Sequence, residues 1–309
     1  MFKVATYNVE NLFDLNKKGY KHKEYKAFTP SLWNKKNYKI KLQNIAKVIK
    51  DIDADIITLQ EVHSLDALKD LRLELKKNGL YYQYYKITDN KPTAIHVAFL
   101  SKFPFVYTKE LKVTSSYKYR NILEAKLNID GQNLYLFANH WKAKSGPESM
   151  RITSAKVLRN RVAQVGYEKN IILLGDFNSD YEEYIKFIRK RRHNDTNGKT
   201  GINHVLRTIK QGHNSFYNLW YDAKEKDRYS YIYRGKKEAL DNILISQSLL
   251  IKDGISYITS SIKNLDKKYL FKKKQIFRWQ VSRARVPKHK GKGYSDHLPV
   301  MAKFKINSN

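Results

Sequence analysis

The sequence has 309 residues and a formal net charge of +31, because 60 lysines and arginines stand against 29 aspartates and glutamates. It contains no cysteine, which excludes disulfide bonds and thiolate metal sites. No apolar run reaches the roughly 18 residues that a membrane-spanning helix needs, so no transmembrane segment is expected. The positive charge favours a polyanionic partner, either nucleic acid or an anionic membrane surface, over lysine-rich composition alone.

Apolar spacing predicts strands and helices along the whole chain. The N-terminal part is expected to hold a strand at 2–7, a helix around 42–52, a strand at 56–60 and a helix at 65–80. Strands of mixed type with few helices between them indicate sheets packed on each other with helices outside. The later elements are predicted as strands at 81–87, 94–100, 121–129 and 133–138, a helix at 154–164, and strands at 171–174, 229–233, 241–246, 254–260 and 299–306.

The whole chain, 1–309, is expected to form one domain. A compact fold of this length buries about 75% of the surface that the unfolded chain exposes. No Gly/Ser-rich linker or internal repeat divides the sequence, although basic, poorly periodic insertions are expected near 183–213 and 263–292. The compartment stays open. Met1 stands directly before a strand-like segment, so the protein is periplasmic or secreted if a leader was removed, and cytoplasmic otherwise.

Several short apolar strands end abruptly in polar, ionisable residues. A carboxylate at the end of a buried strand is poorly solvated unless a cation or a hydrogen-bonding partner compensates. Taken singly, Glu61 could cap the next helix, Asp176 could close a turn and His140 could be a satisfied core histidine. Together, at one edge of a core, such strand ends would make an oxygen-rich site suited to Mg²⁺. The residues are Asn8, Glu61, His140, Asp176 with Asn178, Asp241, and Asp296 with His297.

Six segments resemble the signature blocks of the endonuclease/exonuclease/phosphatase superfamily, and they occur in that family's order. Gly-Asp-Phe-Asn is moderately specific and Ser-Asp-His-Leu-Pro-Val is more so. The resemblance implies an α/β fold, a four-layer α/β sandwich with two mixed β-sheets packed face to face and helices outside. It is most similar to bacterial, often exported, deoxyribonuclease-like members. The segments are Thr6–Asp14, Leu59–Val62, Ala138–Lys142, Gly175–Asn178, Leu240–Leu244 and Ser295–Val300.

The resemblance also implies a metal site and an activated water. Glu61 is similar to the principal Mg²⁺ ligand of the family, with Asn8 and Asp296 nearby, and Mn²⁺ or Ca²⁺ are the alternative ions. Asp176 matches the residue that orients or deprotonates the attacking water. Asn178 matches an amide that hydrogen-bonds the same centre. Phosphodiester hydrolysis needs such a water, a base and positive charge around phosphorus.

Histidines and an arginine are implied on the phosphate. His297 would stabilise the charge on phosphorus, and Asp241 would hold its imidazole in the working tautomer. His140 matches a second histidine of the deoxyribonuclease-like and sphingomyelinase-like members, which abasic-site endonucleases generally lack. Arg120 resembles a phosphate-contacting arginine of deoxyribonucleases, although it could be an ordinary strand-edge cation. Ile95–Val97 departs from the pancreatic-type pattern, because no glutamate is present there to support His140.

Basic segments add a candidate nucleic-acid surface. Residues 263–292 carry twelve lysines and arginines, one acid and four interleaved aromatic residues, and they lead directly into Ser295–His297. Cations with aromatics suit phosphates and exposed bases, whereas the alternative is a solvated, partly disordered insert. The role of the cluster 189–192 is undecided, and Tyr231 or Tyr233 either lines a groove or packs a strand. The residues expected to contact nucleic acid are Lys142, Tyr231, Lys272, Lys273, Lys274 and Arg278.

The sequence therefore predicts a monomeric, Mg²⁺-dependent phosphodiesterase that cleaves DNA, with RNA as an alternative substrate, and with little sequence preference. No protein partner is implied. A sphingomyelinase-like phospholipid phosphodiesterase is the nearest alternative, but no apolar loop tipped by Trp or Phe is evident for membrane docking. An abasic-site repair endonuclease is disfavoured by Arg120 and His140. A non-catalytic, basic DNA-binding protein is disfavoured by the complete set of site residues.

Overall fold

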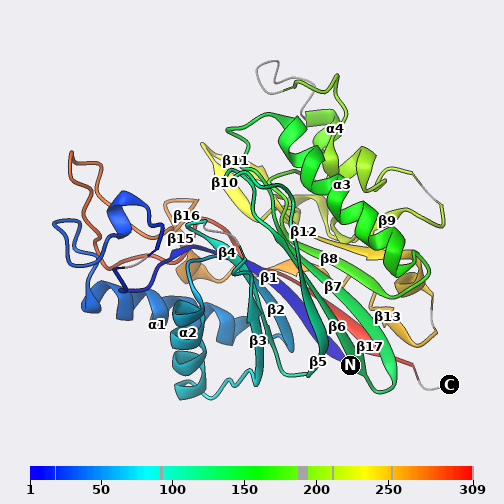
Figure 1. Cartoon of the computed structure of the whole chain (residues 1–309), viewed down its shortest axis with the longest axis horizontal. Coiled ribbons are helices and arrows are strands. Elements are labelled where there is room, and N and C mark those ends of the chain that lie inside the picture. Colours follow the sequence, from blue (N-terminus) through cyan, green and yellow to red (C-terminus); the bar gives the residue numbers. More distant parts are fainter. Residues whose placement is uncertain (18, 91–92, 187–193, 211, 252, 308–309) are drawn as a thin grey trace.

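The computed structural model describes residues 1–17, 19–90, 93–186, 194–210, 212–251 and 253–307 (Figure 1). The basic cluster expected at 189–192 lies outside these residues. None of the described helices combines the length and apolarity that crossing a bilayer requires.

The first sheet has the order β13-β17-β1-β2-β4-β3, with β14 also paired to β17. Its centre is a parallel pair, β1 (Phe2–Leu12) and β2 (Ile56–Val62), and the other pairs are antiparallel. Helix α1 (Lys35–Ile52) connects the parallel strands, beginning where the Asn34 side chain accepts a hydrogen bond from the Asn37 N–H. The other strands are β3 (Tyr84–Ile87), β4 (His96–Ser101), β13 (Ile255–Tyr257), β14 (Lys263–Asn264) and β17 (Val300–Ile306).

The second sheet repeats this plan with the order β5-β6-β7-β8-β12-β9. Strands β7 (Gln132–His140) and β8 (Ile171–Asp176) are parallel, and α3 (Glu148–Val165) connects them. The neighbouring pairs are again antiparallel. The other strands are β5 (Phe105–Leu111), β6 (Ile122–Ile129), β9 (Phe216–Asn218) and β12 (Asp241–Ser246).

Three apolar clusters hold the layers together. Val4 and Ile56 of the first sheet pack with Leu134 and Ile243 of the second, so one cluster lies between the sheets. A second cluster lies under α1 and α2 (Leu65–Lys77), and a third lies under α3. Figure 1 shows α1 and α2 on one outer side and α3 on the other, with the sheets between. The predicted four-layer α/β sandwich is confirmed.

Six described strands lie where no strand was predicted: β5, β9, and the short strands β11 (Lys236–Glu238), β14, β15 (Phe271–Lys272) and β16 (Gln275–Ile276). Strand β5 was missed because it is an edge strand whose residues are mostly half-buried, so its apolar pattern is weak. Strand β9 has only three residues. The predicted strand at 254–260 is shorter, Ile255–Tyr257, and the helix predicted at 154–164 is longer, because α3 begins at Glu148. In the basic stretch 183–213, the one-turn helix α4 (Glu183–Lys186) and a π-helical turn (Gly201–Val205) are present.

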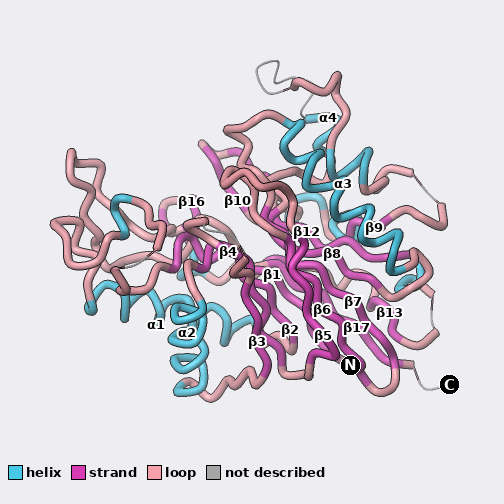
Figure 2. The backbone as a smooth tube through the Cα atoms, in the orientation of Figure 1, coloured by secondary structure: helices cyan, strands magenta, loops and turns pink. Residues whose placement is uncertain are grey.

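The insertion 263–292 is anchored to the core by a few buried residues, although most of its residues are half-buried or exposed. Its residues Leu270, Ile276 and Trp279 are buried in the cluster under α1. The His289 N–H donates to the Ser31 carbonyl, and the His289 ring contacts those of Tyr25 and Trp33. Figure 2 shows the insertion and the segment around residues 25–33 as mostly loop, side by side at one end of the molecule. The insertion is therefore attached to the body of the protein through these buried residues.

His289, with its imidazole neutral, connects the insertion 263–292 to the segment that contains Glu24. Its Nδ1 accepts a hydrogen bond from the Trp279 indole at 2.8 Å, and its Nε2 donates to the Glu24 carbonyl at 2.9 Å. Burial is the largest cause that lowers the pKa of His289, and the charge of Lys41 lowers it further, while the contacts with Glu24 raise it. Protonation of His289 at Nδ1 would place its N–H against the indole N–H of Trp279. Acid therefore disfavours the contact between these two residues.

We expect the protein to lose stability as the pH falls through the ordinary histidine range, in part through His289. The folded pKa is depressed, so the stabilisation is present above the unfolded pKa of about 6.5 and is lost as pH falls toward the folded value. His289→Gln keeps a hydrogen-bond donor and an acceptor at this position and cannot be protonated. Melting temperatures at pH 8 and pH 5 should fall less in the variant than in the parent. An equal loss on acidification would show that His289 does not contribute.

Candidate active site

The strand directions bring the polar strand ends to one edge of the two sheets. Strands β1 and β2 are parallel, so Asn8 and Glu61 lie at the same end. His140 and Asp176 are paired at the ends of the parallel strands β7 and β8. Strand β12 is antiparallel to β8 and β17 to β1, so both begin where the others finish. Asp241 therefore lies opposite Asp176, and Asp296 and His297, just before β17, join the same edge.

The backbone at this edge is strained at four non-glycine residues. Glu10, Asn11, Glu61 and Asn178 have φ angles between 47° and 66°, in the left-handed region. Both β1 and β2 shift register at these positions, which turns the side chains of the bulged residues toward the site. Strain of this kind is sparsely populated and clusters at functional sites.

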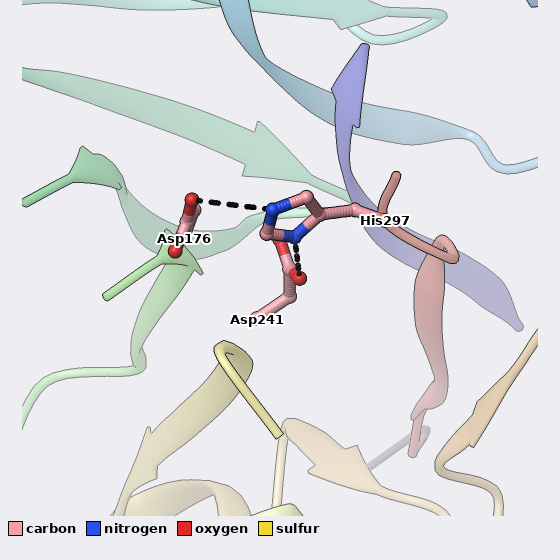
Figure 3. A group of neighbouring side chains, drawn as sticks. All are labelled: Asp176, Asp241 and His297. Carbon is pink, nitrogen blue, oxygen red and sulfur yellow. Dashed lines mark hydrogen bonds and ion pairs between the residues drawn. The ribbon is translucent and has the colours of Figure 1, made fainter. Parts of the chain in front are cut away.

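Asp176, Asp241 and His297 form a buried group at the centre of the site (Figure 3). His297 Nδ1 is 2.6 Å from an Asp241 carboxylate oxygen, and its Nε2 lies 3.9 Å from Asp176 Oδ2. The three ligand atoms lie within 4.8 Å of one another. A hydrogen bond already occupies Nδ1, so the arrangement favours an imidazole oriented by Asp241 over a cage for an ion. Burial lowers the pKa of His297, but Asp241, then Asp176 and Asp296, raise it well above its usual value.

Asp176 is held in place from two sides. Its Oδ1 accepts from the Asn178 N–H at 2.8 Å, and its Oδ2 accepts from the Asn8 side-chain amide at 3.1 Å. Burial is the main cause that raises the pKa of Asp176, and Asp241 adds to it, while His297 lowers it. The Asn178 side chain donates instead to the Trp141 carbonyl at 3.1 Å. A carboxylate whose pKa is raised toward neutrality is suited to accept a proton from water.

The preceding glycine fixes the course of β8. Gly175 has φ 135°, and a Cβ there would lie 2.1 Å from the Asn139 carbonyl oxygen on β7. Only glycine allows β7 and β8 to approach this closely. The glycine of the Gly-Asp-Phe-Asn segment thus places Asp176 beside His140.

The carboxylate oxygens at this edge fit a hard divalent cation. Glu61 Oε1 and Asp176 Oδ2 both lie beside the Asn8 amide nitrogen, at 3.2 and 3.1 Å, and Asp296 lies at the same edge. Oxygen ligands of this kind suit Mg²⁺, Mn²⁺ or Ca²⁺. Asn8 presents its nitrogen here, because its Oδ1 accepts from the Glu10 N–H at 3.0 Å. Coordination by Asn8 Oδ1 would require a flip that loses this bond, so its role as a ligand stays a prediction.

His140 and Arg120 also lie close to the carboxylates Glu61 and Asp176. His140 Nε2 is 3.6 Å from Asp176 Oδ2 and 3.9 Å from Glu61 Oε1. Burial, then the charges of Arg120 and His297, lower the pKa of His140 well below its usual value. Its Nδ1 is buried and has no hydrogen-bond partner among the described residues, so no side chain there replaces the acid missing at 95–97. Arg120 donates to the Trp141 carbonyl at 3.0 Å.

Comparison with known proteins identifies the family. A sequence model of the Endonuclease/Exonuclease/phosphatase family matches residues 3–306. The chain belongs to this family. It is therefore placed among hydrolases of phosphate esters. Bovine (Bos taurus) protein angel homolog 2 is 26% identical over 196 residues, which cover 58% of this chain and 35% of that protein. The chain thus spans about a third of the length of this curated relative.

Solved structures share the family fold. The mannosyl-6-phosphatase of Bacteroides thetaiotaomicron superposes with a TM-score of 0.62, at 15% identity, over 99% of this chain and 100% of that one. D. rerio TDP2 complexed with single strand DNA product gives a TM-score of 0.61, at 15% identity, over 98% of each chain. At this identity the likeness establishes the fold alone.

The residues predicted to contact nucleic acid separate into two groups beside the family's site. Tyr231, Lys272, Lys273 and Arg278 line one groove that reaches Asp296, whereas Lys274, also exposed, is not among its lining residues. The Lys142 side chain is half-buried outside the groove lining, and burial and then the charge of Arg120 lower its pKa. Basic residues thus lie beside the site both in the groove and near Arg120.

Glu10 and Arg278 form a contact that sequence reasoning missed. Arg278 donates from Nε and Nη2 to Glu10 Oε1, at 2.8 and 2.5 Å, and its Nη2 lies 3.3 Å from Asp296 Oδ2. Glu10 is buried, and its other oxygen accepts from the Trp279 N–H. Burial raises the pKa of Glu10 to about 8, although Lys41 and Arg278 lower it. No local signal marked this contact, because Glu10 lies beyond the strand predicted at 2–7. Contact of Arg278 with nucleic acid stays a prediction, but its charge is already shared by two acids.

We expect Arg278→Gln to raise the metal concentration needed for activity, because Arg278 orients Asp296 at the predicted metal site. Loss of an outer partner of a metal ligand typically costs about 10–100-fold in metal affinity or activity. Metal titrations of activity should move to higher concentration in this variant and stay unchanged in Arg285→Gln, an exposed cation of the same segment. If the curves overlay and only the salt dependence of DNA binding changes, Arg278 contacts phosphate instead.

Proposed function

We propose that this protein is a divalent-metal-dependent nuclease that hydrolyses phosphodiester bonds in DNA. The observation that carries the proposal is the Asp241–His297–Asp176 group beside Glu61, Asn8 and Asp296 at one sheet edge. The net charge of +31 and the basic residues beside the site favour a polyanionic substrate over a small phosphate ester. The TDP2 structure with single strand DNA product supports DNA as the substrate class.

The residues divide the reaction between them. A cation bound by Glu61 and Asp296, with Mg²⁺ as the expected ion, would neutralise phosphate charge and orient the phosphate. Asp176 Oδ2 accepts a proton from the water whose oxygen attacks phosphorus, as the bond from phosphorus to the leaving oxygen breaks. Asn8 and Asn178 hold Asp176 in position through their hydrogen bonds.

Positive charge around the phosphate comes from His297 and Arg120. His297, kept protonated by Asp241, donates from Nε2 to the phosphate oxygens. Arg120 supplies a permanent charge, and neutral His140 offers an N–H. Preformed donors placed where charge develops are usually the largest contribution to catalysis.

A direct assay tests the proposal. Plasmid DNA, single-stranded DNA and RNA are incubated with purified protein and Mg²⁺, then with EDTA. Mannose 6-phosphate and choline-headgroup vesicles are assayed in parallel. We expect DNA cleavage that EDTA abolishes. Release of phosphate from the sugar, or vesicle hydrolysis, with the DNA left intact would overturn the assigned substrate.

A further inference from the structure

A groove of about 1010 Å³ runs outward from the active-site edge between two small hairpins. Its inner end is formed by Tyr231 and Asp296. One wall is the hairpin of β10 (Tyr231–Tyr233) and β11 (Lys236–Glu238), and the other is that of β15 (Phe271–Lys272) and β16 (Gln275–Ile276). Strand β10 packs beside β16. Figure 1 shows the two hairpins as neighbours above the first sheet.

Both hairpin tips hold basic residues in a strained backbone conformation. Arg234 has φ 48°, and Lys273 and Lys274 have φ 50° and 60°. Two-residue hairpin turns of this kind need positive φ, which Asn and Gly adopt far more readily than Lys or Arg. Strain that persists at a long basic side chain suggests a functional use of that side chain. The tips place Arg234 and Lys273 on opposite walls of the groove.

A row of aromatic rings leads from the catalytic histidine along β10. The Tyr231 ring lies 4.9 Å from the His297 ring, and the two residues form an isolated β-bridge. Tyr233 is two residues further, on the same face of the strand, and is 53% exposed. The Arg234 guanidinium lies 5.3 Å from the Tyr233 ring centroid. An exposed ring beside a cation is a stacking platform for a base, with the cation near the phosphate.

The groove is cationic at its outer end. Within the described part of the chain, Arg234, Lys272, Lys273 and Arg283 make no salt bridge, whereas Arg278 is paired with Glu10 and Asp296. Glu24 also lines the groove. The lining thus holds five cations and three acids, and its four cations without a salt bridge complement a polyanion.

We propose that this groove holds an unpaired strand of nucleic acid that continues from the scissile phosphate. In this proposal, which rests on the proposed function, Tyr233 stacks on a base while Arg234, Lys272 and Lys273 neutralise phosphates. An unpaired strand fits because its bases present free faces to Tyr233, whereas the bases of a duplex stack on each other. The substrate class is thus DNA with a single-stranded segment beside the cleaved bond.

Binding of labelled oligonucleotides in EDTA tests the groove without cleavage. The probes are a fluorescein-labelled oligothymidylate and a blunt duplex of equal length, followed by fluorescence anisotropy. Tyr233→Ala should weaken oligothymidylate binding about 5- to 150-fold, the range for losing one base–aromatic stack, and leave duplex binding unchanged. Lys272→Gln with Lys273→Gln should flatten the salt dependence by about 0.7 in log–log slope for each lost contact.

Two matched controls keep the test specific. Tyr81 also lies beside a cation, 5.5 Å from Arg72, but outside the groove, so Tyr81→Ala should bind like the parent. Lys236→Gln removes a charge from the β10–β11 hairpin, which also carries Tyr233, but Lys236 does not line the groove. Equal effects of Tyr233→Ala on both probes, or none, would overturn the proposal even if the parent cleaves DNA. Tyr233-dependent binding without any cleavage would instead refute the nuclease function and support the groove.

Discussion

Replacing Asp176 with asparagine is expected to lower the turnover of DNA about 10²- to 10⁴-fold, the usual cost of removing a general base. The carboxylate is buried, and its pKa is raised mainly by burial, so it can take a proton near neutral pH. Asparagine keeps the size of the side chain and can still accept the Asn178 N–H, so the fold should survive. Initial rates at saturating metal and DNA measure the effect.

The control for Asp176→Asn is Asp130→Asn in the turn between β6 and β7, where asparagine tolerates the observed φ of 49°. This control should match the parent in rate. Melting temperatures of all three proteins exclude unfolding as the cause of a loss. Parent-like turnover in the Asp176 variant, with correct folding, would show that Asp176 is not the base.

The order of the motifs along the chain allowed most of the site to be predicted. Every proposed catalytic residue lies at the end of a short apolar strand or within three residues of it, a pattern visible in the sequence because buried strands and polar residues contrast strongly. The directions of the strands then explain why these residues meet at one edge of the sheets. Parallel β1 and β2 bring Asn8 and Glu61 together, and β17 returns antiparallel to bring His297 to the same edge. The family resemblance supplied the roles, which composition and spacing alone left open.

What could not be predicted depends on contacts between distant segments. Glu10 and Arg278 are 268 residues apart, and nothing local distinguishes Arg278 from its basic neighbours. The basic composition of the insertion predicted a nucleic-acid surface, with a solvated loop as the alternative, and it did not indicate contacts with the core. Burial of Trp279 against the cluster under α1 becomes visible only in three dimensions. Edge strand β5 was missed for a related reason, because a strand with one sheet neighbour needs no continuous apolar run.

Glu61→Gln is the second change expected to have a large effect, and its effect should fall on metal binding. Glu61 stands in a bulge with φ 66°, with Oε2 fixed by the Asn11 N–H at 3.0 Å and Oε1 by the Asn8 amide at 3.2 Å. This geometry presents a preorganised carboxylate beside Asp176. A neutral amide at the same place loses the charge that attracts a hard cation.

We expect the Mg²⁺ concentration for half-maximal activity of Glu61→Gln to rise by on the order of 100-fold or more, because loss of an outer partner of a ligand alone costs about 10–100-fold. Calorimetric titration with Mn²⁺ gives the same comparison without turnover. Glu168→Gln, an exposed carboxylate beyond α3, is the matched control and should titrate like the parent. Activity restored at high Mg²⁺ would separate a metal ligand from a structural residue, since a misfolded protein would not recover. Overlaying titrations of variant and parent would remove Glu61 from the proposed metal site and leave Asp296 as the carboxylate assigned to it.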